Sequence, residues 1–261
     1  VIAHGGDSAW NAHVIATAQS VKTGGPVEVS FLMGPAAKEA RFQDVVARLE
    51  RQGVAHVVVV PMLVSSHSGH YDQIRWLTGD SVRLSETMTH HLHMAGIDRA
   101  RTALPIRLAP AMDDAPEIAR VLVDRARAMA PDAKTGDRAV MIVGHGPNSA
   151  EDYAAWMTNL RAVADSVKRQ GGFRDVRVEL VRDDAPAAVR SEAVRRTREL
   201  IEMQHAITGR DVLVVPLLVS KGAINRDKLP RDLAGLPIVY NGEPLLPHPA
   251  MVRWVERLVK P

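Results

Sequence analysis

The chain has 261 residues, of which 46% are hydrophobic and 24% charged, and it carries a formal net charge of +3 with a pI near 9.4. This composition is typical of a soluble globular protein, and no apolar run approaches the roughly 20 residues of a membrane span. The absence of cysteine excludes disulfides, thiolate metal sites and a cysteine nucleophile. With only three Phe and three Tyr to stack bases, we expect no nucleic-acid binding, and the positive charge suits a polyanionic small molecule.

Short apolar runs rich in β-branched residues alternate along the chain with longer amphipathic stretches. The predicted strands are 1–3, 27–32, 54–60, 106–109, 139–143, 176–181, 212–215 and 238–240. The predicted helices are 9–22, 38–52, 115–129, 150–170, 186–208 and 249–259. This alternation predicts an α/β fold whose parallel sheets are covered by helices on both faces.

The chain also repeats itself. The segment 1–8 returns as 142–149, with the shared pattern His-Gly-x-(Asp/Asn)-Ser after a strand, and 57–65 returns as 212–220. A repeat of this extent predicts two copies of one supersecondary unit. We therefore expect two pseudo-symmetric, doubly wound parallel-sheet lobes, residues 1–132 and 137–261, separated by the turn residues 131–137.

The first half carries an insertion that the second lacks. Pro61 and Pro216 are 155 positions apart, whereas the later strands that begin at Ile106 and Ile238 are only 132 apart, a difference of 23 residues. Insertions of this length are usually functional or disordered. The inserted segment, residues 71–104, contains Met88, His90, His91, His93 and Met94. If it is helical, His90, His93 and Met94 share one face, which suits either metal recruitment or a solvated surface.

Each His-Gly motif follows a strand, at the edge where open α/β sheets bind their ligands. Glycine permits a tight turn there, and the N–H groups of the helix that follows can hold a carboxylate or phosphate. The polar residues after the glycines suit ligand binding or simple N-capping equally well. His4 is the stronger candidate for function, because packing explains an imidazole at a strand end poorly.

The second candidate element is Ser65-Ser66-His67-Ser68-Gly69-His70, after another strand. In a parallel sheet this tip can lie beside that of His4 and bring two or three imidazoles together. Neutral imidazole binds Co, Ni, Fe and Zn ions, and it accepts protons near neutral pH. The second copy has Lys221 here and no histidine, so we expect the chemistry in the first half. Lys221 and Arg226 are available to carboxylates, and His248 is expected to open the last helix.

Several familiar enzyme classes are disfavoured because their sequence motifs are missing. The chain has no Gly-x-Ser-x-Gly nucleophile elbow, no P-loop and no His-Glu-x-x-His, and its glycine motif only half matches a dinucleotide-binding loop. A hydrolase that uses the His-Gly-Gly loop with Ser65 or Ser66 as nucleophile is a further possibility.

Together, the strand-His-Gly opening, the Val-Val-Val-Pro strand that leads to Ser-Ser-His, and the tail Gly242–Pro249 resemble CbiX-like sirohydrochlorin chelatases. These are relatives of the anaerobic cobaltochelatases and of ferrochelatase, and the resemblance covers both halves, as in the long two-lobed form. It implies a lyase that inserts a divalent metal ion into sirohydrochlorin or a related tetrapyrrole. Co²⁺ is the expected ion, with Fe²⁺ and Ni²⁺ as alternatives. Neither ATP nor a tightly bound cofactor is expected.

The resemblance implies a tetrapyrrole between the lobes, with His4 as the first catalytic and metal-handling histidine and His67 as the second, and with His70 as a close competitor of His67. It also implies that Arg75, Lys221 and Arg226 meet the carboxylates of the macrocycle. The expected substrate-binding residues are Gly5, Gly6, Asp7, Ser8, Ser65, Ser66, His145, Gly146, Asn148, Ser149 and Lys221. Where the family often has a strand-end Glu, this chain has Met33, which favours the alternative of a metal or tetrapyrrole carrier without turnover. We expect no membrane or nucleic-acid partner, a monomer or homodimer, and a cytoplasmic location, or export if a signal peptide preceded Val1.

Overall fold

The structure is a computed structural model that describes residues 1–131 and 134–260, so positions 132–133 of the expected boundary lie outside the described residues. Its first compact unit contains the strands β1 (Ile2–Ala3), β2 (Ser30–Phe31), β3 (Val57–Val59), β4 (Pro61–Met62) and β5 (Ile106–Leu108). β1 pairs in parallel with β2 and β4, and β3 pairs in parallel with β5. Because only Val60 separates β3 from β4, the order across this unit is β2, β1, β4 with β3, then β5.

The second unit has a parallel sheet of the same order. Its strands are β6 (Ala139–Gly144), β7 (Asp175–Leu180), β8 (Val212–Leu217) and β9 (Ile238–Tyr240), arranged β7-β6-β8-β9. Every residue of β6 and β8 is buried, as expected for central strands covered on both faces. The α/β prediction of two lobes built from parallel sheets is confirmed.

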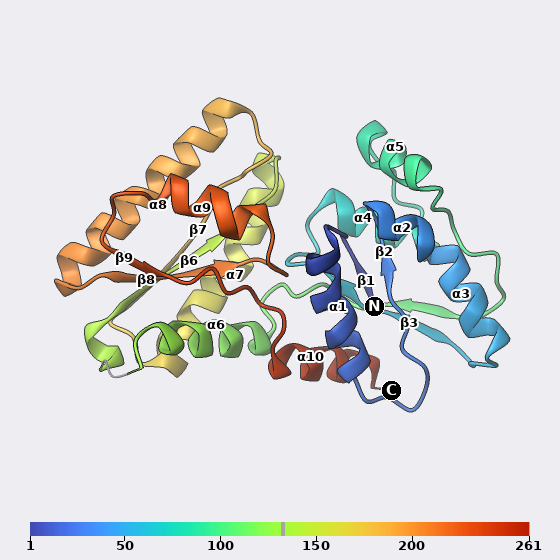
Figure 1. Ribbon diagram of the computed structural model, residues 1–261. Helices are drawn as coiled ribbons and strands as arrows, with labels where there is room; N and C mark the ends of the chain where they lie inside the picture. The colour runs from blue at the N-terminus through green and yellow to red at the C-terminus, as the bar shows by residue number, and fades with distance from the viewer. Residues whose placement is uncertain (132–133, 261) are drawn as a thin grey trace. The chain divides into compact units, whose positions relative to one another are not determined.

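Helices cover both sheets (Figure 1). The first unit holds α1 (Ser8–Ser20), α2 (Pro35–Glu39), α3 (Phe42–Arg51), α4 (Gly69–Leu77), α5 (Glu86–Ala95) and α10 (Pro249–Val259). The second unit holds α6 (Pro116–Met129), η1 (Thr135–Asp137), α7 (Ala150–Gly171), α8 (Ala187–Thr208), η2 (Ile224–Lys228) and α9 (Leu229–Asp232). α3 shows why such segments fold onto a sheet, because Phe42, Val45, Val46 and Leu49 form one buried stripe at helical spacing.

The compact units do not follow the expected lobes 1–132 and 137–261. Unit 1 consists of residues Val1–Asp113 and Leu246–Pro261, and unit 2 consists of Asp114–Leu245. Helix α6 therefore belongs with the second sheet and packs on α7, while α10 belongs with the first sheet and packs on α1. Each last helix of the sequence repeat thus lies in the other compact unit.

The predicted helix 38–52 is two helices, α2 and α3, in the structure. The break falls at Ala40, whose φ of −130° is not helical and whose carbonyl accepts a hydrogen bond from the Ser30 hydroxyl at 2.8 Å. The non-helical backbone at Ala40 ends α2, and the contact with Ser30 holds this residue against β2. The inserted segment 71–104 is not irregular either, because it contains most of α4 and the whole of α5.

Candidate metal centre

His4 follows the carboxyl end of β1, as predicted, on a loop that requires glycine. Gly5 has a φ of +95°, and a Cβ atom there would lie 2.2 Å from the carbonyl oxygen of Met33. The Nδ1 of His4 lies 2.7 Å from the Gly5 carbonyl oxygen. Because a carbonyl can only accept, Nδ1 carries the hydrogen, and the lone pair of the neutral ring is on Nε2. This is the tautomer and anchoring that metal-binding histidines commonly use.

The residues after His4 hold the loop in place. Asn11, which is buried in α1, accepts from the Gly6 N–H at 2.9 Å and donates to the Gly6 carbonyl at 3.2 Å. Asp7 is the N-cap of α1 and accepts from the Trp10 N–H at 2.8 Å. Asp7 therefore has the capping role that the sequence left open, and Ser8 is the first residue of the helix.

The second predicted element is rigidly anchored through its serines. The Ser66 hydroxyl donates to Asp113 at 2.6 Å, and its N–H donates to the same carboxylate at 2.8 Å. Ser65 is buried and its hydroxyl accepts from the His67 N–H at 3.1 Å. Ser66 is thus oriented by a carboxylate and not by an imidazole base, which is contrary to the arrangement of a hydrolase nucleophile.

His4 and His70 meet at this edge of the first sheet. Their ring centroids are 4.6 Å apart, with an interplanar angle of 85°. Nδ1 of His70 lies 2.8 Å from Oε1 of Gln73, a completely buried side chain, so this ring also donates from Nδ1 and has its lone pair on Nε2. The side chain of His67 is exposed. The structure thus brings His70, one of the two expected partners of His4, into contact with it.

The second unit repeats the loop with different partners. Gly146 has a φ of +83°, Ser149 is the N-cap of α7, and His145 donates from Nδ1 to the Gly146 carbonyl at 2.7 Å. Nε2 of His145, however, lies 3.0 Å from the carboxylate of Asp184. Burial opposes protonation of this ring, but the hydrogen bonds to Asp184 and Gly146 and the nearby negative charges outweigh it and raise the pKa of His145.

His145, Asp183 and Asp184 place metal-ligand atoms within 4.8 Å of one another. Asp183 is already neutralised by Arg190 at 3.1 Å and by a short contact with Lys228, and these cations lower its pKa although burial alone would raise it. This cluster therefore has the charge balance of an ion-pair network. In half one the counterpart of His145 faces an imidazole, so the first unit remains the better candidate for metal chemistry.

The expected carboxylate-binding cations have protein partners. Arg75 bridges Asp72 and Asp80 at 3.1 and 2.6 Å, and Lys221 pairs with Glu243 at 3.0 Å. Arg226 is exposed. His248 is the N-cap of α10 and accepts from the Ala250 N–H, so its predicted structural role is confirmed.

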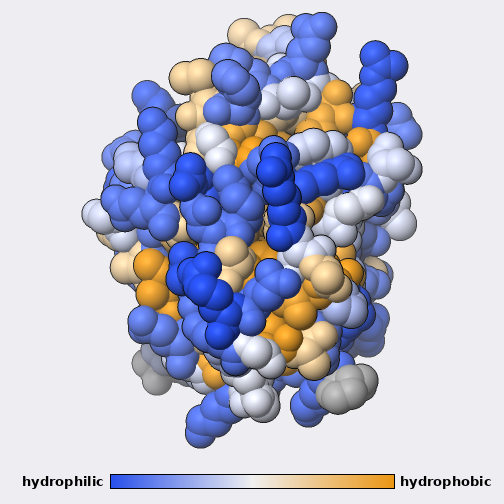
Figure 2. All heavy atoms as spheres, turned by 90° about the vertical axis from the view of Figure 1, so that its right-hand side faces the viewer, coloured by the Kyte–Doolittle hydropathy of each residue, from blue (hydrophilic) through white to orange (hydrophobic). Residues whose placement is uncertain are grey.

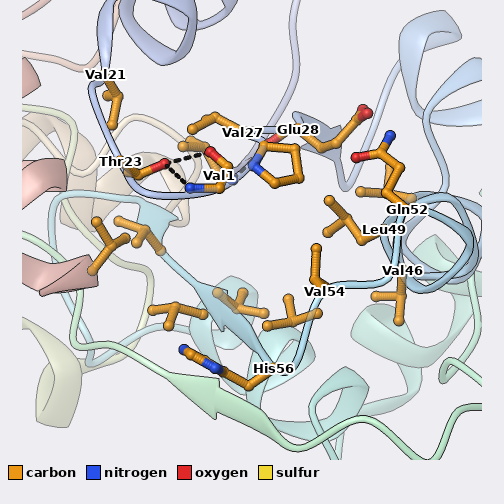
Figure 3. Close-up of a pocket in the computed structure, with 18 of the residues that line it drawn as sticks. Val1, Val21, Thr23, Val27, Glu28, Val46, Leu49, Gln52, Val54 and His56 are labelled. Carbon is orange, nitrogen blue, oxygen red and sulfur yellow. Dashed lines mark hydrogen bonds between the residues drawn. The ribbon is translucent and has the colours of Figure 1, made fainter. Parts of the chain in front are cut away.

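A cavity of about 620 Å³ lies at the other edge of the first sheet. Figure 3 shows Val1, Val27 and Glu28 lining it from one side and Val54 and His56 from the other. The cavity lies at the amino end of β1, whereas His4 follows the carboxyl end of this strand.

Two functional candidates, Gln73 and Asp113, were not predicted from the sequence, and His91 was named in the insertion but not on the face expected to bind metal. Gln73 orients His70, Asp113 anchors Ser66, and His91 lies beside His70 with a centroid distance of 6.2 Å. Gln73 stands at i+3 from His70, a spacing that would have flagged it had α4 been predicted. Asp113 lies 47 positions from Ser66, and nothing in the local sequence connects them.

None of the described helices is long and apolar enough to cross a membrane. On the side that Figure 2 shows, hydrophobic side chains are interspersed among hydrophilic ones.

Three solved structures have a fold similar to that of this chain. SirB from Bacillus subtilis with Fe³⁺ matches over 99% of this chain and 92% of its own, with a TM-score of 0.66 and 17% identity. DR2241 from Deinococcus radiodurans, described as structurally similar to chelatases, matches over 98% of this chain and 53% of its own, with a TM-score of 0.63 and 17% identity. CbiX, described as the terminal enzyme for siroheme biosynthesis in denitrifying bacteria, matches over 99% and 96%, with a TM-score of 0.55 and 15% identity. No curated protein matches the chain significantly.

The arrangement of sheets and loops therefore defines a protein of the chelatase fold. The model of the CbiX family matches residues 1–129, so this part of the chain is similar to the CbiX family, as its motifs implied.

Proposed function

We propose that this protein is a metal chelatase, a lyase that inserts a divalent ion into sirohydrochlorin or a related tetrapyrrole. The observation that carries the proposal is the contact between His4 and His70, two imidazoles with anchored Nδ1 atoms at the carboxyl edge of a parallel sheet. The CbiX match over the same half and the likeness to SirB support it. No phosphate-binding loop occurs in the sequence, which supports a reaction without ATP.

The rings of His4 and His70 have different proposed roles in metal insertion. An incoming divalent ion displaces two protons from the pyrrole nitrogens, so the site must hold a cation and accept protons. Nε2 of His4 is the proposed ligand, and Nε2 of His70 is the proposed base, held in orientation by Gln73. His67, which is exposed, is proposed to act at the entrance of the site rather than at the reacting nitrogen atoms.

The substrate carboxylates are proposed to bind at the helix N-termini that follow Gly5 and Gly146, because these ends carry unsatisfied N–H groups and a partial positive charge. The proposed contacts in these loops are Gly5, Gly6, Asp7, Ser8, His145, Gly146, Asn148 and Ser149. Ser65, Ser66 and Lys221 complete the proposed set. Lys221 already pairs with Glu243, so a substrate carboxylate must compete for it.

The metal is proposed to be Co²⁺, with Fe²⁺ and Ni²⁺ as competitors, since imidazole suits all three. Met33 favours a second candidate function, a carrier that binds metal or tetrapyrrole without turnover. The backbone N–H of Met33 donates to the carbonyl of His4 at 2.8 Å, so Met33 lies next to the candidate metal centre. The family often has a carboxylate at this position, where this chain has a thioether.

The test is insertion of Co²⁺, Ni²⁺ and Fe²⁺ into sirohydrochlorin followed by absorbance, with the intact chain and its His4→Ala and His70→Ala variants. His56→Ala is the matched control, because His56 is exposed at the opposite edge of the same sheet. We expect multiple turnovers that both site variants abolish and the control retains.

A spectral change that stops at one equivalent would favour the carrier. Turnover that survives in the His4→Ala/His70→Ala double variant would refute the assignment of the site. His67→Ala is expected to slow insertion without abolishing it.

A further inference from the structure

A third imidazole adjoins the pair. His70 lies between His4, at a centroid distance of 4.6 Å, and His91, at 6.2 Å, and the rings of His70 and His91 are nearly parallel at 18°. His91 belongs to α5, in the segment 71–104. The face that the sequence singled out, His90, His93 and Met94, is instead exposed to solvent. His91 is the histidine of this helix that approaches the candidate metal centre.

Helix α5 is held firmly against the residues that carry His70. Gln73 accepts from His70 through Oε1 and donates through Nε2 to the carbonyl of Met88 at 2.7 Å. A Cβ atom on Gly69, the first residue of α4, would lie 2.9 Å from Sδ of Met88, so the two helices approach too closely for a side chain there. Leu92 is buried on the same helix. These contacts fix the helix that carries His91.

Nδ1 of His91 is buried and has no hydrogen-bond partner among the described residues. A buried polar atom without a partner costs free energy and is uncommon in native structures. A ligand that satisfies the ring would offset that cost.

The spacing of the rings suits ions shared between neighbours. With a metal–nitrogen distance of about 2.1 Å, a ring centroid lies about 3.2 Å from its ion, so two rings on one ion have centroids at most about 6.4 Å apart. Both observed centroid distances, 4.6 and 6.2 Å, fall within this limit. The distances therefore allow His70 to share an ion with either neighbour. The nearly parallel rings of His70 and His91 must turn for their in-plane lone pairs to meet at one ion.

We propose that His91 is a further metal-handling residue, which holds the incoming divalent ion together with His70 before the ion passes to His4 and leaves Nε2 of His70 to accept a proton. The proposal rests on the proposed function for the purpose of the transfer, but the binding step is independent of it. The insertion in the first half of the repeat would then supply the entry position of the metal centre.

The test is an equilibrium titration of the tetrapyrrole-free protein with Co²⁺, followed by its visible absorption and by competition with a chromophoric chelator. His91→Ala is expected to weaken Co²⁺ binding about tenfold or more, as losses around metal sites commonly do. His90→Ala and His93→Ala, the same change at exposed positions of the same helix, are expected to leave the affinity unchanged. In the insertion assay His91→Ala should raise KM for the metal with kcat little changed.

A double-mutant cycle with His70→Ala separates direct ligation from a structural effect. If both rings bind one ion, the loss in the double variant is smaller than the sum of the single losses. His91→Gln, which keeps a polar side chain of similar length, provides a second variant should His91→Ala unfold.

Unchanged Co²⁺ affinity in folded His91→Ala and His91→Gln, or strictly additive losses, would overturn the role of His91 and leave the chelatase proposal standing. Weakened Co²⁺ binding in a protein that never inserts metal would support His91 and refute the chelatase proposal.

Discussion

His4 and His145 donate from Nδ1 to the carbonyl of the following glycine at the same distance, 2.7 Å, yet their Nε2 atoms have different surroundings. His145 faces a carboxylate, which stabilises the protonated ring, whereas His4 faces the imidazole of His70. A protonated imidazole cannot ligate a metal. The two histidines thus differ in one partner: His145 forms a charged pair in unit 2, whereas His4 belongs to the candidate metal centre in unit 1.

The His145–Asp184 pair predicts a pH dependence of stability. Because the folded-state pKa of His145 is raised above its unfolded value of 6.5, the pair contributes stability that is fully present below about pH 6.5 and is lost as pH rises through the folded pKa. Asp184→Asn should remove this contribution. We expect the difference in unfolding free energy between the original protein and Asp184→Asn, measured by urea unfolding from pH 6 to 9, to shrink as pH rises. A difference that grows or stays constant would contradict the pairing.

Gly5→Ala tests the backbone of the His4 loop. The change forces a side chain into the left-handed region, at about 1–2 kcal/mol, and in addition drives Cβ against the Met33 carbonyl at 2.2 Å. Gly53→Ala is the matched control, since Gly53 has a φ of +75° and open space around it. Urea unfolding should show a clearly larger loss for Gly5→Ala, and its Co²⁺ affinity should fall. Equal losses in the two variants would mean that the close approach to Met33 is absent.

At the scale of elements, α5 is attached to α4 and α3 by a glutamine near each of its ends. Gln73 joins α4 to the Met88 carbonyl, and Gln43 of α3 donates to the Gly96 carbonyl at 2.7 Å and accepts from the Asp98 N–H at 3.1 Å. Gln73 is completely buried and Gln43 is partly exposed. The Gln73 contact therefore contributes more to the positioning of α5 than the Gln43 contact, because its buried partners cannot form hydrogen bonds with water instead.

Gln73→Leu leaves the His70 Nδ1–H and the Met88 carbonyl without their partner, at a cost of about 1–3 kcal/mol for such buried groups. We expect this variant to lose hydrogen-exchange protection across α5 and to bind Co²⁺ more weakly. Gln43→Leu, the same change at the other end, should loosen only the last turn of α5. If the two variants are indistinguishable in Co²⁺ affinity, Gln73 has no role in orienting His70.

The alternation of strands and helices was predictable because most of these segments are long and strongly periodic. α5 escaped prediction although its end signals were present: Ser85 is the N-cap and Gly96 is the left-handed C-cap. Its composition, with three histidines in four positions, hides the apolar stripe on which prediction depends. His4 and His70 were predicted because both follow strands. Gln73 and Asp113 act through contacts that only the folded chain creates.

At the scale of the molecule, the repeat in the sequence and the compact units differ by one helix each. α10 ends the second repeat but buries Met251, Trp254 and Val255 in unit 1. Its ends are tied to the same unit, because Glu256 accepts from the Lys22 N–H and the Leu258 carbonyl accepts from Arg107. Because α10 packs in unit 1, the stability of the unit that carries His4 depends on the far end of the chain.

Trp254→Ala tests this dependence. The side chain is 1% exposed, and its truncation leaves a cavity that costs about 3–5 kcal/mol. We expect hydrogen exchange to accelerate in β1, β2 and α1 of unit 1, with Co²⁺ affinity reduced, while β6 to β8 keep their protection. Trp156→Ala in α7 is the reciprocal control and should affect β6 and β7 first. If Trp254→Ala instead exposed β6 and spared β1, α10 would belong to the second unit, and the compact units would coincide with the sequence repeat.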